Sequence, residues 1–502
     1  MPPPQSSVDP GRPSRGASPA SRPGVEVPPA GTVAVVGTGP AGIYSAQMLL
    51  KQLPGVSVDL FDKLPAPFGL VRYGVAPDHP AIKRIQEPLQ DVLESAGVRL
   101  LCNVEVGRDV SVQELSEHYD AVVLATGAEQ DAPLDVPGHD LPGSHGAAAF
   151  VAWYNSHPDA DPRWSLRARA AAVVGGGNVA LDVTRVLAQQ ADRLLSTDVS
   201  DDVHEALRRS ELREVHVFVR RGPVGTRFSP LELRELGEQP GFDVVVDPGD
   251  VVVDDHTRRM VEQFSPKRQV LETLTGWAHR DPASLTAPRR VHLHFFQAPV
   301  LIGGTGSVEF LRTERTEHDE VGHVRGTGRL TTTPVQAVYR AVGYASSPVP
   351  GAPFDRRRRL IPNRAGRVLD DDGGVVPGLY VTGWAKRGPV GLIGSTKSDA
   401  RETVTHLVED LLARGAGPGR SGGVPAAGGT RGLFHAPSAD VVDLGGWSRI
   451  HAAELAAGVA RRRDRVKIAT RRGLLDVARA GREDPDPAGP ITSDRPGTQP
   501  TP

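Results

Sequence analysis

Short apolar runs, each followed by a glycine-rich turn and a helix-like stretch, occur at two places in the chain. The first run, Thr32 to Val36, leads into the turn Gly37-Thr-Gly-Pro-Ala-Gly42, and residues 43–53 have the composition of a helix. The second run, Ala171 to Val174, leads into Gly-Gly-Gly-Asn-Val-Ala over residues 175–180 and then into an apolar-periodic stretch. Each pattern predicts a strand, a tight turn and a helix, so we expect an α/β protein with two Rossmann-like units.

The first glycine turn has the spacing of a dinucleotide-binding site. Gly37 would make the tight turn, Gly39 would let the backbone approach a pyrophosphate, and Gly42 would let the helix pack on the strand. The N-terminus of that helix would hold the phosphates. A further apolar run, residues 56–61, ends in Asp62, where a carboxylate can reach a ribose 2′-hydroxyl. The alternative is a glycine turn in an unrelated α/β unit.

The second glycine turn is followed by positive instead of negative charge. The next apolar run, Val215 to Val219, leads into Arg220 and Arg221, whose guanidinium groups can bind a 2′-phosphate bidentately. This pattern is expected for NADP(H), although adjacent arginines can also be a solvated pair at a strand end. An acid at one site and paired arginines at the other therefore predict FAD at the first site, NADP(H) at the second, and hydride transfer between them.

Composition and charge narrow the class of protein. The 502 residues suffice for roughly three domains at about 150 residues each. The 58 Lys and Arg against 60 Asp and Glu give a net charge of −2, so we expect no nucleic acid as a partner. The single cysteine, Cys102, excludes a disulfide, a dithiol redox pair and a four-Cys iron–sulfur cluster within this chain. Since no apolar run reaches 18 residues and no secretory signal is present, the sequence predicts a cytoplasmic protein without membrane insertion.

Segments rich in proline and glycine mark the predicted ends and one break. Residues 1–30 hold nine prolines and are predicted to be a disordered tail, as are residues 483–502. A mitochondrial transit peptide is the alternative for the first segment, but prolines this dense oppose the amphipathic helix that it needs. Residues 416–432 are predicted to be a flexible linker. Residues 120–127, ending in Ala-Thr-Gly, predict a buried strand beside a nucleotide site or within a parallel core.

Four stretches, in order along the chain, resemble the adrenodoxin-reductase-like ferredoxin/NADP reductases. They are PFGLVRYGVAPDH at 67–79, FVAWYN at 150–155, RRGP at 220–223 with LELRE at 231–235, and GWAKRGPVGLIG at 383–394. The resemblance covers about residues 32–480. It implies a discontinuous FAD domain made of residues 31–130 and 340–415. It further implies an inserted NADP domain over residues 131–339 and a C-terminal extension, residues 433–482, that packs on the FAD domain.

The resemblance also implies roles for single residues. The first turn and Asp62 would hold the ADP half of FAD, while the second turn would face the NADP(H) pyrophosphate and Glu232 the nicotinamide nucleotide. Glu is usual in the family where Asp62 stands, so the ribose contact would be made by a shorter side chain. No metal site is expected. The predicted cofactor-binding residues are Gly37, Gly39, Pro40, Ala41, Gly42, Asp62, Leu70, Gly177, Asn178, Val179, Arg220, Arg221, Glu232, Trp384, Gly391 and Ile393.

His79 and Asp182 match a pair near the flavin in similar enzymes, and we predict them as the catalytic residues. A titratable pair there could handle the proton of the flavin. Each has a plainer interpretation. His79 could be a turn histidine with a satisfied hydrogen bond, and Asp182 could interact only with the helix dipole. Trp384, predicted beside the isoalloxazine ring, could likewise be ordinary core packing.

The predicted reaction passes a hydride from NADPH to flavin N5 and then single electrons to a small acidic ferredoxin. Because this chain has no iron–sulfur domain before its flavin domain, the acceptor would be a separate molecule. Arg234, Lys267 and Arg268 could form a basic docking face, or they could be a solvated charge cluster. A monomer is the simplest expectation.

Two other functions stay open at this stage. An NADP(H)-binding sensor or scaffold would keep the nucleotide fold without electron transfer, although the intact stretch from Trp384 to residue 394 argues against that loss. A flavin monooxygenase also carries two dinucleotide motifs, but the sequence shows no motif for its substrate pocket. The family pattern is also matched only loosely over residues 224–230, so the details of cofactor clamping there are open.

Overall fold

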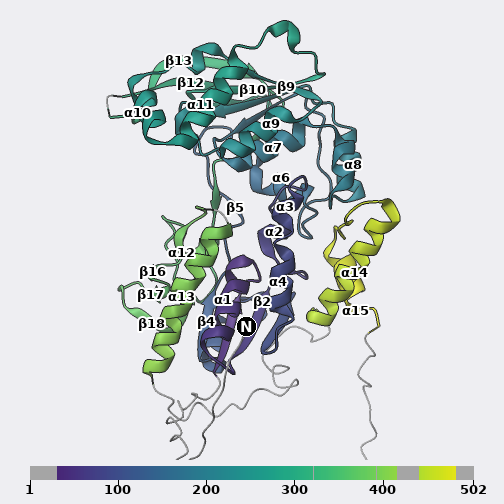
Figure 1. Ribbon diagram of the computed structural model, residues 1–502, viewed down its shortest axis with the longest axis vertical. Helices are drawn as coiled ribbons and strands as arrows, with labels where there is room; N and C mark the ends of the chain where they lie inside the picture. The colour runs from purple at the N-terminus through teal and green to yellow at the C-terminus, as the bar shows by residue number, and fades with distance from the viewer. Residues whose placement is uncertain (1–30, 320, 392, 415–439, 482–502) are drawn as a thin grey trace, which may run out of the picture.

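The computed structural model describes residues 31–319, 321–391, 393–414 and 440–481. The two predicted tails, 1–30 and 483–502, and the predicted linker, 416–432, lie outside the described residues. The described chain forms two large sheets, one above the other in Figure 1, and two smaller ones, with a pair of C-terminal helices along one side.

The first sheet has seven strands and combines the two ends of the described chain. Its central strands are parallel, and the three strands at one edge, all from the C-terminal half, form an antiparallel ribbon. In order across the sheet the strands are β16 (Asn363–Arg364), β17 (Arg367–Leu369), β18 (Val375–Val381), β4 (Ala121–Leu124), β1 (Thr32–Val36), β2 (Ser57–Asp62) and β3 (Val98–Cys102).

Both faces of this sheet are covered, which explains why its central strands are continuously apolar. Val33 and Val35 pack on one face against helices, whereas Ala34 and Val36 pack on the other against residues of the loops and of two short helices. Figure 1 shows the first and the longest of the helices side by side over the sheet. The helices of this part are α1 (Pro40–Gln52), α2 (Gly69–Tyr73), α3 (Pro80–Lys83), α4 (Gln86–Leu93), α5 (Val112–His118), α12 (Trp384–Arg387) and α13 (Ile393–Ala413).

The second sheet has six strands, all parallel. Helices cover one of its faces, and a three-stranded antiparallel sheet covers part of the other. The six strands in spatial order are β6 (Ser144–Gly146), β14 (Ala337–Arg340), β7 (Ala170–Val174), β8 (Glu214–Val219), β10 (Arg289–Phe295) and β9 (Phe242–Val246). The small sheet contains β11 (Gln297–Gly303), β12 (Phe310–His318) and β13 (Val324–Pro334). The helices of this part are α6 (Ala147–Tyr154), α7 (Asn178–Ala188), α8 (Asp201–Arg208), α9 (Pro230–Glu238), α10 (Asp255–Gln263) and α11 (Ser265–Ala278).

The chain crosses between the two parts twice, through a short antiparallel pair, β5 (Gln130–Asp131) and β15 (Tyr344–Ala345). The domain limits predicted at 130/131 and at 339/340 fall beside these crossings, and they stay predictions. Both glycine turns lie as expected, each between a parallel strand and the helix that follows it. The fold is therefore of the predicted α/β class, with two Rossmann-type units.

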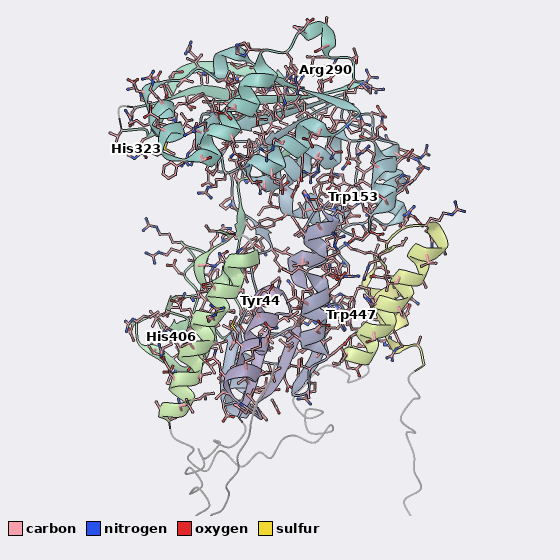
Figure 2. All side chains as sticks on the ribbon, viewed as in Figure 1. Tyr44, Trp153, Arg290, His323, His406 and Trp447 are labelled. Carbon is pink, nitrogen blue, oxygen red and sulfur yellow. The ribbon has the colours of Figure 1, made fainter. Side chains whose placement is uncertain are left out.

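The last described segment packs along the first part and contacts the second. It contains α14 (Leu444–Arg461) and α15 (Arg471–Arg479), at the right of Figure 1. Trp447, labelled in Figure 2, packs edge-on against Phe68 with ring centroids 5.6 Å apart. Towards the second part, Lys467 Nζ lies 2.9 Å from the Asp198 carboxylate. In the described part of the chain, no helix has the length and apolar character that crossing a membrane requires.

Candidate functional site

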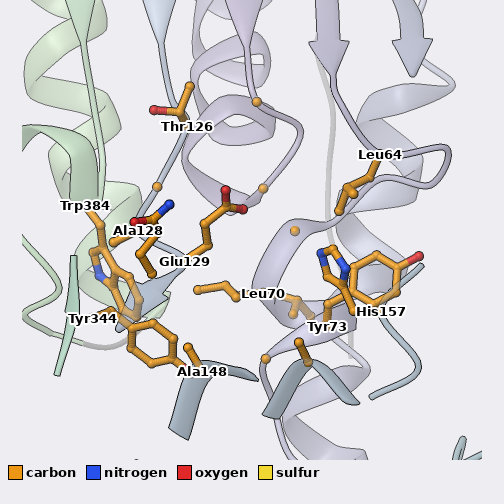
Figure 3. Close-up of a pocket in the computed structure, with 18 of the residues that line it drawn as sticks. Leu64, Leu70, Tyr73, Thr126, Ala128, Glu129, Ala148, His157, Tyr344 and Trp384 are labelled. Carbon is orange, nitrogen blue, oxygen red and sulfur yellow. The ribbon is translucent and has the colours of Figure 1, made fainter. Parts of the chain in front are cut away.

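A single cavity of about 1040 Å³ runs between the two glycine turns and is lined by residues of both parts of the fold. Figure 3 shows Trp384 and Tyr344 on one side of it, with Tyr73 and His157 on the opposite side. Most of the predicted cofactor and catalytic residues line this one cavity. They are Gly37, Gly39, Pro40, Ala41, Asp62, Leu70, His79, Asn178, Val179, Asp182, Glu232, Trp384 and Gly391.

The first glycine turn leaves backbone donors open to the cavity. Gly37 has φ of +110°, and a Cβ atom there would lie 2.4 Å from the carbonyl oxygen of Ala125. A Cβ at Gly42 would lie 1.9 Å from the carbonyl oxygen of Gly37, so both positions require glycine. Gly39 precedes α1 and has no side chain to cap it, which leaves the first N–H groups of the helix free for an anion. This geometry fits a pyrophosphate.

Asp62 lies at the cavity wall, but its hydrogen bonds hold the protein's own loops. Its carboxylate accepts bonds of 2.9 Å from the backbone N–H groups of Thr38 and Leu64. Burial raises the pKa of Asp62, and these bonds partly oppose that shift. The carboxylate thus joins the glycine turn to the end of β2, and its contact with a ribose stays a prediction.

The cavity wall also offers aromatic surface and unpaired hydroxyl groups. The rings of Trp384 and Tyr344 lie 5.9 Å apart at 36°. The hydroxyl oxygens of Thr126 and Ser347 are buried without hydrogen-bond partners among the described residues. Because buried polar atoms are normally paired, two such atoms at one cavity fit a bound group that carries both rings and polar edges, as FAD does. Ile393 is the first residue of α13, and its side chain lies outside the described atoms.

The second glycine turn is closed by the loop before α9. Arg227 N–H donates to the carbonyl of Gly176 at 2.6 Å, and Ser229 N–H donates to Asn178 Oδ1 at 3.0 Å. Gly177 precedes α7 as Gly39 precedes α1, again without a side-chain cap. The loop of residues 224–230, which resembles the family only loosely, therefore packs directly on the second glycine turn.

Arg220 and Arg221 line a second cavity, of about 670 Å³, beside this turn. Arg227 and Lys267 line it too. Burial lowers the pKa of Lys267, and the charges of Arg221 and Arg227 lower it further. These positive charges repel one another, and a bound anion with more than one negative charge, such as a 2′-phosphate, would relieve the repulsion. Lys267 was expected on a docking face, which stays a prediction; its ammonium donates to the carbonyl of Thr226 in the loop beside this cavity.

A charged cluster joins the two parts of the fold at the cavity. His79 Nε2, from the loop before α3, lies 3.0 Å from Asp182 Oδ1 on α7 and 3.3 Å from Glu232 Oε2 on α9. The buried Arg185 donates to Asp182 at 2.7 Å and to Asp78 at 2.6 Å, and its Nη2 also lies 2.5 Å from His79 Nε2. Burial and the charge of Arg185 lower the pKa of His79, but hydrogen bonds to Asp182 and Glu232 outweigh them and raise the pKa to about 10. Three carboxylates against one guanidinium thus favour a protonated imidazole.

This cluster predicts a stability difference that depends on pH. Since the pKa of His79 rises from 6.5 unfolded to about 10 folded, its contribution is full below pH 6.5 and is lost as the pH approaches 10. The free energy of unfolding of the native chain exceeds that of His79→Gln, and this difference should shrink by about 1–2 kcal/mol between pH 6.5 and 10. This figure is smaller than the full pKa shift would give, because the ring is partly exposed to solvent. Thermal unfolding of both proteins across this range measures it, and an advantage that stays constant would contradict the protonated state.

Some residues of the site were not found by sequence reasoning. Arg185 lies one turn after Asp182 on α7. An arginine among the apolar positions of a predicted helix indicates a buried charge with a partner, so the sequence could have identified it. Tyr344 and Glu129 line the cavity from segments without a recognisable pattern. Conversely, Gly42 and Gly177 are absent from the lining. A Cβ at Gly42 would lie 3.2 Å from the side chain of Val35, which fits close packing of the helix on the strand, and Gly177 is the N-cap residue of α7.

Comparison with known proteins agrees with this geometry. Residues 31–234 match the family model described as pyridine nucleotide-disulphide oxidoreductase. The NADPH-ferredoxin reductase FprA of Mycobacterium tuberculosis is 40% identical over 457 residues, which cover 89% of this chain and 98% of that protein. The mitochondrial NADPH:adrenodoxin oxidoreductase of Bos taurus is 38% identical, over 87% of this chain and 89% of that protein.

A solved structure shows that the likeness extends to the whole fold. The structure of Mycobacterium tuberculosis FprA in complex with NADPH superposes with a TM-score of 0.82 at 39% identity. The match covers 89% of this chain and 99% of that chain. Because both the sequence and the fold match over nearly the full length of these proteins, the chain belongs to the family of NADPH-dependent ferredoxin and adrenodoxin reductases.

Proposed function

We propose that this protein is an NADPH-dependent flavoprotein reductase that passes electrons to a ferredoxin-type iron–sulfur protein. The observation that carries the proposal is the single cavity lined by residues of both glycine turns. Two separate nucleotide sites would serve a sensor equally well, but a shared cavity lets two rings meet. Its relatives are NADPH-ferredoxin and NADPH:adrenodoxin reductases by name.

The residues of the chain have distinct tasks in this function. The free N-termini of α1 and α7 bind one pyrophosphate each, while Arg220 and Arg221 select a nucleotide with a 2′-phosphate. Bound FAD supplies the chemistry that takes up two electrons together and releases them one at a time. His79 lies at the wall of the shared cavity as the residue that carries a proton, and the carboxylates of Asp182 and Glu232 favour its charged form.

The electron acceptor is a separate protein in this proposal. We infer a small acidic ferredoxin, because the relatives are named for ferredoxin and adrenodoxin. The basic side chain of Arg234 is exposed on α9, whereas its neighbour Leu233 is buried, so an arginine is available to an acidic partner. Arg268 is also at the surface, where its guanidinium donates to the carbonyl of Val261. The cytoplasmic location and the monomeric state stay predictions.

An anaerobic titration tests the function. The purified protein, reconstituted with FAD, should lose its flavin absorbance band with NADPH at far lower concentration than with NADH. Adding a ferredoxin and cytochrome c should then give continuous NADPH-driven reduction of the cytochrome. Nucleotide binding without bleaching would leave the sensor as the better account, and bleaching without any transfer to ferredoxin would contradict the proposed acceptor. Rapid oxygen consumption with an organic substrate would favour the monooxygenase.

A further inference from the structure

Three histidines share one face of the second sheet, on the neighbouring strands β8 and β10. In the parallel register of β8 and β10, His292 lies opposite His216, and His294 lies opposite Phe218. Residues two apart on a strand point to the same side, so His216, His292 and His294 face the same way. Figure 2 labels Arg290, which stands two positions before His292 on the same strand.

The three rings and one carboxylate approach one another closely. The imidazoles of His216 and His292 stack with centroids 4.7 Å apart and planes at 11°. His216 Nδ1 lies 3.1 Å from His294 Nε2, and His216 Nε2 lies 3.2 Å from Glu214 Oε2. One ligand atom each from Glu214, His216 and His292 lies within 4.8 Å of the others.

Burying imidazole nitrogens in this part of the sheet is destabilising unless they have binding partners. Farther along the same face, Phe218 packs in an apolar cluster under the small sheet. His292 Nε2 is buried with no hydrogen-bond partner among the described residues. Arg290 is turned away, because its guanidinium donates to the carbonyl of Leu285 and pairs with Asp243 at 3.0 Å. A buried nitrogen left unpaired beside two other ligand atoms indicates a missing partner.

We propose that Glu214, His216 and His292 bind a divalent transition-metal ion, with Zn²⁺ the best match. Imidazole nitrogens and a carboxylate oxygen suit this ion, and ligand atoms on tetrahedral zinc lie roughly 3.3 Å apart. The exposed Glu214 and the half-buried His292 can rotate to close that distance. His294 is a positioning residue, because His216 can donate from Nδ1 to His294 Nε2 while Nε2 binds the ion.

The location agrees with such a site. Glu214 is the first residue of β8, whereas Arg220 and Arg221 follow its last residue. The ion would therefore bind at the opposite end of the strand from the proposed NADP(H) site, and the inference does not depend on the proposed function.

Calorimetric titration of the metal-free, FAD-loaded full chain with ZnCl₂ tests the proposal. We expect one Zn²⁺ per chain and at least about tenfold weaker binding by His292→Leu. This variant removes the unpaired nitrogen, so its thermal midpoint in chelator should not fall below that of the native protein. Zn²⁺ should raise the midpoint of the native protein and not that of the variant. Glu214→Gln, at an exposed position, repeats the test without touching the core.

A half-buried histidine away from the proposed site, His204, supplies the matched control. His204 Nε2 lies 3.0 Å from Asp192 Oδ1, the same pair of groups without a third ligand, so His204→Asn should bind Zn²⁺ as the native chain does. Three results would each overturn the proposal. They are native protein without saturable one-to-one binding, unchanged affinity in both His292→Leu and Glu214→Gln, and binding that is lost in His79→Gln but kept in His292→Leu.

Discussion

Replacing Arg220 and Arg221 together by glutamine is expected to raise the KM for NADPH by roughly 100-fold or more, with little change in kcat. Hydrogen bonds to a charged group contribute about 1.5–3 kcal/mol each, and both guanidinium groups line the cavity in which we place the 2′-phosphate. Neither lines the cavity shared by the two glycine turns, so the reacting rings should stay in position. The KM for NADH, which has no 2′-phosphate, should change little.

Steady-state kinetics with both nucleotides measures this change in preference. Arg258→Gln is the matched control, because Arg258 is an exposed arginine on the neighbouring α10 that pairs with Asp255 at the surface. It should leave both KM values as they are. If the double variant raised the KM for NADH as much as that for NADPH, the two arginines would be acting on the loop and not on the phosphate.

The dinucleotide turns could be predicted because everything that defines them is contiguous. A strand, three glycines and a helix follow one another within about twenty residues, and the structure needs glycine at Gly37 and Gly42 for reasons of space that any such turn imposes. Arg220 and Arg221 could be predicted for the same reason, since they follow directly on a recognisable strand.

Residues that meet only through tertiary structure were harder to assign. His79 and Asp182 are 103 positions apart, and only the resemblance paired them. The place of Lys267 beside Arg221 and Arg227 could not be predicted from its own sequence neighbours, because those arginines belong to another segment. The alternation of His292 and His294 is visible in the sequence, but His216 joins them only through the register of two strands that are 75 residues apart.

Glu454→Leu is expected to destabilise the protein by about 3–5 kcal/mol, because it leaves the charge of Arg72 buried without compensation. Both side chains are at most 1% exposed, and Arg72 donates to the two carboxylate oxygens at 3.0 and 2.5 Å. Glu454 also accepts from Ile468 N–H and from Arg465. Burial raises the pKa of Glu454, but Arg72 outweighs it and lowers the pKa, so the pair is ionised.

The consequence should reach the flavin end of the site. Arg72 belongs to the same short helix, α2, as Leu70 and Tyr73, which line the shared cavity, while Glu454 belongs to α14 beside it. Loss of the pair should therefore weaken both the packing of the C-terminal helices on the first part of the fold and the binding of FAD.

Denaturant unfolding and release of FAD, followed by fluorescence, measure the two effects of Glu454→Leu. Arg461→Gln is the control on the same helix, since Arg461 pairs with Asp201 at the surface and should cost less than about 1 kcal/mol. The double variant Arg72→Met with Glu454→Leu removes both charges and should recover much of the lost stability. If the double variant were as unstable as Glu454→Leu, the loss would come from packing around α14 and not from an uncompensated charge.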